Sequence, residues 1–414
     1  MSEAAAVTAT APVAPPAVAP VSRPTVRACR PAALAAVPAR EWDALRTPGS
    51  APLAHRYLCA WESSELAGLR SRPILVYRED GRRPVAACPG YGYDLDVAGV
   101  RSPRIEQLLR WPRRLWPRAG ITRAYELGCG TPMTNPFLVA HPGTLTTVLP
   151  VLLDAALEEA SAQRAGFVLV QSFTSRDGPV AEQLSNRGFV AVPMPQTAVL
   201  ALPYGSFDEY LAAMRSSYRR RARQTLKQTR ELAVEHRPRF ADLADELARL
   251  WRAVYDRATE LKREIIGPAF FTGISELGES SVLLVRRPDG SIACFALLLD
   301  DRPWLSFVYC GFEVSTGRQE GAYFRLLYEI VRYAIAHGYE QVDLGMTTLA
   351  PKFDLGAVPV PLFGWFKHRN PIVQHALSAL GRGPLRPQAL EPRHVFKEPA
   401  PTAEELVAAR GLYA

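Results

Sequence analysis

The sequence predicts an α/β fold of two tandem units, in which helices pack on central mixed sheets. The chain has 414 residues, more than the roughly 250 to 300 at which a single hydrophobic core stops growing. Apolar residues make up 48% of the chain, which is enough for two cores. The order helix, glycine, apolar strand occurs twice, and each time it follows an Asp-Gly hairpin signal.

Composition divides the chain into four parts. Residues 1–27 are rich in Ala and Pro without periodicity, so we expect a disordered tail. Pro203 and Gly205 interrupt two periodic segments, so we expect a hinge within 202–207 that joins two separate sheets. The other three parts are an N-terminal unit at 28–203, a C-terminal unit at 204–371 and a helical extension at 372–414.

The N-terminal unit begins with apolar residues at mixed helical spacing in 41–62. Residues 73–79 and 83–96 then flank Asp80 and Gly81, a dipeptide typical of tight hairpin turns. This unit therefore opens with an antiparallel pair.

The C-terminal unit has a second hairpin signal. Strands are predicted at 282–286 and 291–299, around Asp289 and Gly290, and a third strand at 304–312. This hairpin corresponds to the opening pair of the first unit.

Each unit then contains the repeated helix and strand. Helices are predicted at 145–164 and 323–337, closed by Gly166 and Gly338, and apolar strands follow both of them. The same order also occurs in α/β proteins without an internal repeat, so the repeat alone does not establish two related units.

Four segments of the C-terminal unit carry a resemblance to a known family. They are SSYRRRARQTLKQTRE, GAYFRLLYEIVRYAIAHGYEQVDLG, PKFDLG and VPVPLFGWFKHRNP. Together they resemble GNAT acyltransferases, and the C-terminal half is similar to the FemABX-type and related GNAT-like enzymes. The resemblance covers about 205–371; the N-terminal half shares only the order of elements.

The resemblance implies acyl transfer to an amine. GNAT enzymes use an acyl-CoA such as acetyl-CoA as co-substrate, and no permanently bound cofactor is expected. FemABX relatives use aminoacyl-tRNA, so tRNA stays open as an alternative partner. A non-catalytic binding protein is the third possibility. The expected acceptor is the amine of a small metabolite or biosynthetic intermediate.

A loop at 313–322 would hold the phosphates of the donor in such a fold. Its glycines permit close backbone approach, and the following helix offers free N–H groups. The family pattern of this loop is matched only in part, because Tyr323 occupies the last small position. Two glycines before a helix also suit an ordinary turn. The predicted donor-binding residues of the loop are Gly317, Arg318, Gln319, Gly321 and Ala322.

A strongly basic helix is predicted at 215–230, which contains seven Arg or Lys residues and no acid. Four of them, Arg219, Arg223, Lys227 and Arg230, form one solvent-facing stripe at helical spacing. We predict that Arg219 and Arg223 bind the donor, since the formal net charge of +8 favours an anionic partner. The alternative is a merely solvated face. DNA is not expected as a partner.

Three residues are the main candidates for catalysis. Asp343 lies between apolar neighbours that would make a carboxylate more basic, so it is the predicted general base; a structural carboxylate is the alternative. Lys352 resembles a family lysine that would neutralise a phosphate or an oxyanion, unless it is a surface lysine. Tyr328 is the third candidate. We expect Asp343 on a central strand, pointing into a cleft beside the donor loop.

The sequence favours neither a metal site nor a location in or across a membrane. The six cysteines are scattered without C-x-x-C spacing, so no metal site is predicted. No apolar run approaches the ~20 residues of a membrane span, and no signal peptide begins the chain. We therefore expect a cytoplasmic protein.

Overall fold

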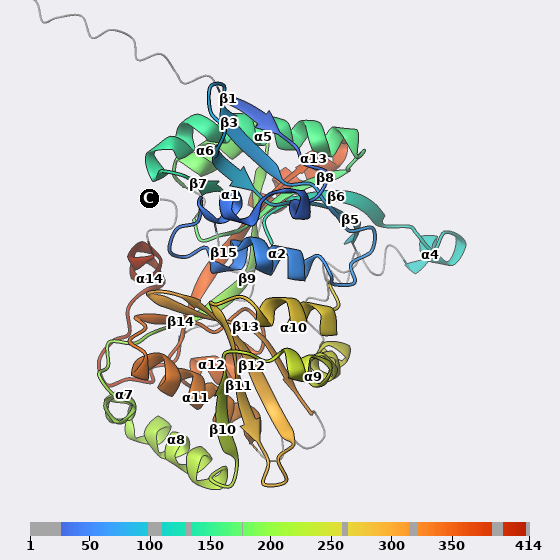
Figure 1. The fold of residues 1–414 in the computed structure, drawn as a ribbon. Helices are drawn as coiled ribbons and strands as arrows, with labels where there is room; N and C mark the ends of the chain where they lie inside the picture. Colours follow the sequence, from blue (N-terminus) through green and yellow to red (C-terminus); the bar gives the residue numbers. More distant parts are fainter. Residues whose placement is uncertain are drawn as a thin grey trace, which may run out of the picture.

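A computed structural model describes residues 26–97, 110–129, 135–175, 177–258, 264–313, 321–382 and 392–410. Residues 1–25 of the predicted disordered tail lie outside these ranges. Figure 1 shows two lobes, one formed mainly by the first half of the chain and one by the second. The predicted α/β fold of tandem units is confirmed, since each lobe has helices packed on strands of a mixed sheet.

The two lobes share one sheet, so the predicted pair of separate sheets is wrong. Eleven strands follow one another in it, and four strands form a smaller second sheet. The order in the large sheet is β10 (Ala233–Arg237), β11 (Ser280–Arg286), β12 (Ile292–Asp301), β13 (Trp304–Phe312), β14 (Gln341–Asp343), β9 (Val190–Ala201), β15 (Val358–His368), β8 (Phe167–Phe173), β6 (Ile121–Leu127), β5 (Gly90–Asp96) and β2 (Arg70–Ser71). The small sheet contains β1 (Val26–Cys29), β3 (Ile74–Arg78), β4 (Pro84–Cys88) and β7 (Leu138–Val139).

The sheet is continuous because the lobes exchange strands at its centre. In each lobe a long helix joins two parallel strands, β6 to β8 by α5 (Leu145–Ala162) and β13 to β14 by α11 (Ala322–Ala336). Strand β9, from the first half, pairs with β14, while β15, from the second half, pairs with β8. Strands β9 and β15 also pair with each other over most of their length. The predicted break at 202–207 follows β9, and the chain there joins two parts of one sheet.

Most predicted elements are present. The second hairpin forms between β11 and β12, and Gly290 adopts a positive φ of 84° at its turn. The first hairpin forms between β3 and β4, as predicted, and the segment 83–96 contains two strands. Pro89 divides it into β4 and β5, which belong to different sheets, because proline cannot donate a hydrogen bond to a sheet ladder.

The other helices of the described residues are short or of medium length. They are α1 (Ala39–Asp43), α2 (His55–Trp61), α4 (Pro112–Leu115), α6 (Pro179–Asn186), α7 (Phe207–Ala213), α8 (Ser216–Gln228), α9 (Ala244–Arg257), α10 (Pro268–Ser275), α12 (Leu349–Phe353), α13 (Pro371–Arg382) and α14 (Ala403–Ala409). Two of them, α13 and α14, lie in the predicted extension. No helix among the described residues is long and apolar enough to cross a membrane. The predicted limits at 203 and 371 stay predictions.

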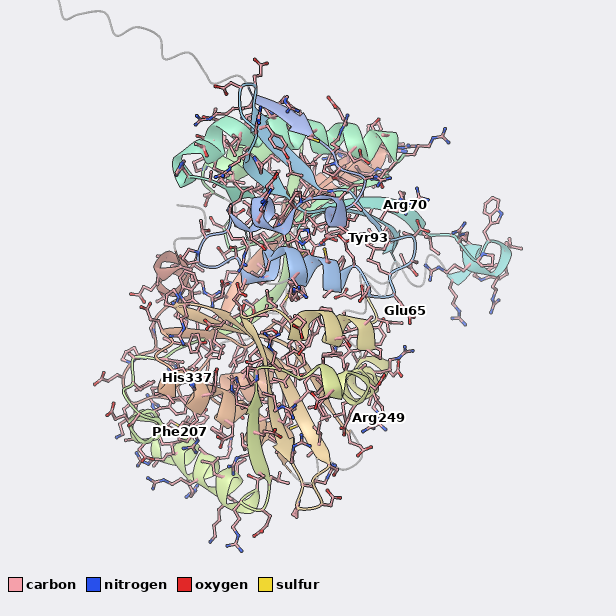
Figure 2. The ribbon with its side chains drawn as sticks, viewed as in Figure 1. Glu65, Arg70, Tyr93, Phe207, Arg249 and His337 are labelled. Atoms are coloured by element: carbon pink, nitrogen blue, oxygen red, sulfur yellow. The ribbon has the colours of Figure 1, made fainter. Side chains whose placement is uncertain are left out.

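The lobes also share a hydrophobic core. Buried side chains of α2 and α10 belong to one cluster, in which Tyr57 meets Phe270 edge-on with ring centroids 6.0 Å apart. Beside them, Glu65 and Ile265 exchange two backbone hydrogen bonds of 2.9 and 3.0 Å. Figure 2 shows Glu65 at this junction between the lobes. Burial and backbone pairing therefore join the two halves.

Candidate active site

The parallel pair β13 and β14 separates early. Only Trp304–Ser306 and Gln341–Asp343 are in register, after which β14 ends while β13 continues to Phe312. A shift in the pairing of β12 with β13 leaves Val308 as an extra residue just beyond this point. The part of β13 beyond the separation, from Val308 to Cys310, is partly exposed. The backbone thus diverges beside the last residue of β14, Asp343.

The Asp343 carboxylate is held by two hydrogen bonds. Its Oδ1 accepts one from the Thr197 hydroxyl at 2.6 Å and one from the Gly345 amide at 2.9 Å. Asp343 is 4% exposed, while Val342 and Leu344 on either side are fully buried in the core against α11. Thr197 lies on β9, so the carboxylate depends on a strand contributed by the first half of the chain. These bonds fix the orientation of the carboxylate, and its predicted role as general base stays a prediction.

Lys352 is buried, so the possibility of a surface lysine is wrong. Helix α12 places its ammonium group where Nζ donates to the Gly345 carbonyl at 3.2 Å and lies 5.7 Å from the centroid of the Phe307 ring. The Gly345 carbonyl therefore accepts a hydrogen bond from Lys352, and the Gly345 amide N–H donates one to Asp343. Its φ of 81° is in the region that favours glycine. The structure brings Asp343 and Lys352 together through this residue.

Cys310 is near the same lysine. Burial raises the pKa of its thiol to about 11, and the positive charge of Lys352 opposes the shift. The thiol therefore stays protonated at neutral pH. This argues against a covalent thioester on Cys310 and favours the role of a small side chain lining β13.

Tyr328 belongs to a different group of side chains. Burial on α11 and, to a smaller extent, the charge of Asp354 raise the pKa of its hydroxyl to about 12, while Arg221 opposes the shift. Arg221 and Asp354 form an ion pair of 3.3 Å that ties α8 to the segment after α12. The charged groups that act on Tyr328 thus belong to α8 and to the segment after α12. The catalytic role predicted for Tyr328 stays a prediction.

The structure describes the two ends of the predicted donor loop, Glu313 and the residues from Gly321 onward. Gly317, Arg318 and Gln319 lie outside the described residues. Gly321, with a φ of 70°, precedes α11, and Ala322 is the first residue of that helix. A Cβ on Gly321 would lie 3.3 Å from the methyl group of Thr229, which follows α8. The N-terminus of α11 therefore lies against the C-terminal end of the basic helix.

The arginines of α8 divide into two groups. Arg219 is partly exposed and donates to the carbonyls of Ala212 and Met214 at 3.1 and 3.3 Å, and its predicted role in donor binding stays a prediction. Arg223 and Lys227 are exposed as predicted. Arg230 is also exposed and forms an ion pair of 3.0 Å with Glu231. Lys227 and Arg230 are closest in the chain to Thr229, and hence to the start of α11.

Thr197 was not among the predicted site residues. It is 146 positions from Asp343, and nothing in its surroundings in the sequence distinguishes it from other threonines on strands. His337, which is also not a predicted site residue, follows the last residue of α11, at the end away from the donor loop, and its ring stacks on Tyr333 with centroids 4.0 Å apart. That position suits a helix end and not this site.

Comparison with known families finds a match within the second half of the chain. Residues 212–351 match the family described as "Acetyltransferase (GNAT) domain". We call this matched segment the GNAT-type domain. It includes the separated strands, α11, Asp343 and the start of α12, so the predicted resemblance is confirmed for this half.

Known proteins are similar to a larger part of the chain. "Putative 8-amino-7-oxononanoate synthase 2" of Mycobacterium tuberculosis is 24% identical over 339 residues, which are 79% of this chain. The chain spans 43% of the length of that relative. Among solved structures, FemX covers 77% of this chain and 97% of its own at 14% identity and a TM-score of 0.47. A tandem GNAT protein from the clavulanic acid biosynthesis pathway covers 84% and 99%, at 14% identity and a TM-score of 0.45.

The raised pKa of Cys310 predicts a slow reaction of its thiol with alkylating reagents. At pH 8 about 0.1% of a thiol with a pKa near 11 is ionised, so iodoacetamide should label Cys310 slowly, and the rate should rise about tenfold per pH unit up to pH 10. Peptide mass spectrometry over that pH range measures the rate. Lys352→Met should slow labelling further, because it removes the charge that opposes the shift. Labelling of Cys310 at pH 8 as fast as that of an unstructured cysteine peptide would contradict the assignment.

Proposed function

We propose that the protein is an N-acyltransferase that moves an acyl group from an acyl-CoA thioester to the amine of a small metabolite or biosynthetic intermediate. The observation that carries this proposal is the separation of β13 from β14 at Asp343, within a GNAT-type domain. Separated strands expose backbone groups that can hold a thioester. The Asp343 carboxylate at the same point can take the proton of the attacking amine.

The donor would bind at the start of α11. The free N–H groups of that helix terminus and the partial positive charge of its dipole suit a pyrophosphate. Gly317, Arg318, Gln319, Gly321 and Ala322 are the proposed residues around it. Arg223 and Lys227 on α8, and Arg230 just after it, add positive charge near this site. Arg219 would contribute indirectly, by holding the carbonyls of Ala212 and Met214 ahead of the helix.

The acyl transfer step would use the buried residues. Asp343 accepts the amine proton directly or through one water, while Lys352 stabilises the backbone at Gly345 and the negative charge that develops on the acyl oxygen. Tyr328 remains protonated at neutral pH, so it is proposed as a donor of a proton and not as an acceptor. The leaving thiolate takes up a proton as CoA departs.

An aminoacyl-tRNA donor is the second candidate, and the exposed positive charge of α8 favours it. A polyanion larger than CoA could contact more of this helix than its C-terminal end. The synthase named among the relatives is matched over less than half of its length, so its activity is not proposed for this chain.

A panel of donors tests the proposed function. Purified protein is incubated with acetyl-, malonyl- and long-chain acyl-CoA and a mixture of amines, and released CoA and acylated amine are measured by mass spectrometry. We expect CoA release that depends on the amine and is insensitive to ribonuclease. Product formed only from charged tRNA, and abolished by ribonuclease, would establish the second candidate. Consumption of neither donor would leave a binding protein without acyltransferase activity.

The Asp343→Asn variant tests the general base. An asparagine Oδ1 can accept the same two hydrogen bonds, so we expect the melting temperature to change little. Basicity is lost, so turnover should fall by a factor of about 10² to 10⁴, with donor affinity nearly unchanged. Steady-state kinetics and donor titration measure both quantities.

Thr197→Val is the matched control for this variant. It removes one hydrogen bond and keeps the carboxylate, so we expect a loss of about 1 to 3 kcal/mol of stability and a much smaller loss of turnover. If Asp343→Asn instead loses stability and regains full turnover on cooling, Asp343 is a structural carboxylate.

Charge reversal at the end of α8 tests the donor site. Lys227→Glu with Arg230→Glu should weaken donor binding by about tenfold or more in low salt, and less as salt is raised, because exposed charges are screened over ~8 to 10 Å. Isothermal titration calorimetry with CoA at several salt concentrations measures this. Arg110→Glu with Arg114→Glu changes the net charge equally on the other lobe and should leave CoA affinity unchanged. Equal effects of the two pairs would show that overall charge alone is responsible.

A further inference from the structure

The segment 110–121, which contains α4, projects from the first lobe. Figure 1 shows it extending sideways from the body, beyond the end of β6 and away from the other helices. We call these residues the α4 projection. They lie outside the GNAT-type domain and contribute nothing to the site described above.

The α4 projection exposes large apolar side chains. Trp111 is 70% exposed, Leu115 80% and Trp116 77%, and Ile121 at its base is 38% exposed. The other tryptophans of the chain are buried: Trp42, Trp61, Trp251, Trp304 and Trp365. Single exposed apolar residues are ordinary, but several large ones on one short projection indicate an interaction surface.

The α4 projection also carries concentrated positive charge. It contains four arginines and no acidic residue. Arg113 shapes the turn by donating to the Ala119 carbonyl at 2.9 Å and to Asp96. Arg118 is 84% exposed and 3.7 Å from Asp94, while Arg114 lies over the ring of Trp111, 5.5 Å from its centroid. Arg110 and Arg114 are exposed and precede Trp111 and Leu115 directly in the chain. We call Trp111, Leu115 and Trp116 the apolar tip of the projection.

We propose that the α4 projection docks the protein on the surface of an anionic lipid bilayer. Tryptophan favours the boundary between headgroups and acyl chains, where its ring is buried and its N–H remains among polar groups. Trp111, Leu115 and Trp116 would enter this boundary. The arginines around them would contact lipid phosphates, as basic residues beside membranes do.

The shape and chemistry of the projection favour a bilayer over other anionic partners. A single-stranded nucleic acid is usually held in a basic groove that stacks its bases, whereas this tip projects from the lobe. Leu115, which is the most exposed of the three residues, offers no stacking surface. A projecting tip can reach the headgroup region of a flat membrane before the body of the lobe meets it.

Vesicle flotation tests the proposal. The full chain is mixed with vesicles of phosphatidylcholine alone, or of phosphatidylcholine and phosphatidylglycerol in equal parts. We expect association with the anionic vesicles only. Trp111→Ser with Trp116→Ser, and separately Arg110→Glu with Arg114→Glu, should each lower the partition coefficient by about tenfold or more. Ile372→Ser should not, although Ile372 is equally exposed at 78% on α13.

A second basic surface provides a further control. Helix α8 is also rich in arginine, but the exposed positions of its stripe carry no large apolar side chain. If Arg220→Glu with Arg223→Glu abolishes flotation and the tryptophan variants do not, the protein binds vesicles through α8 and the proposal is wrong. The same holds if no variant of the projection changes flotation, or if the wild-type chain does not float.

Tryptophan fluorescence gives a direct readout of insertion. Because the other tryptophans are buried, quenching by lipids brominated on their acyl chains should report Trp111 and Trp116. Trp111→Phe and Trp116→Phe should each retain part of the quenching, and the double variant should lose it. Absence of quenching in the wild type would overturn the proposal. So would binding to an oligouridine or an acidic peptide, but not to vesicles, that is lost with the tryptophan variants.

Discussion

The pairing of β9 with β15 at the centre of the large sheet is the interaction on which the rest of the structure depends. Backbone hydrogen bonds run along most of both strands, and each also pairs on its other side with a strand of the opposite half. Neither half of the chain completes its own sheet. The shared core around Tyr57 and Phe270 and the contact of Glu65 with Ile265 add to a junction already made by the backbone.

This exchange determines the environment of the candidate site. Asp343 and Lys352 belong to the second half, but Thr197, which holds the carboxylate, arrives on β9. The geometry beside the separated strands therefore requires both halves. Tyr328 lies near Arg221 of the basic helix α8 and near Asp354. The positive charge proposed to bind the donor is therefore on a helix, whereas the buried carboxylate of Asp343 is on a strand of the sheet.

Local signals predicted the elements, and contacts between distant residues decided their arrangement. Asp289-Gly290 and the glycine after α11 marked a hairpin and a helix end, because these residues act on the neighbouring backbone. The choice of β14 as partner for β9 depends on which edges remain open after each lobe forms. No nearby residue encodes that choice. For the same reason the apolar neighbours of Asp343 singled it out as a candidate in the sequence, whereas nothing near Thr197 pointed to its hydrogen bond with Asp343.

The crossed strands also bear on how such a chain can evolve. The arrangement has the form of a two-fold dimer whose subunits swapped their last strands and were then fused by gene duplication. After such a fusion, mutations can erase the chemistry of one copy without harm, yet deletion of that copy would remove a strand from the other. The first lobe is thus free to acquire new surface features, such as the arginine and tryptophan tip, while it is retained for the strand that it provides.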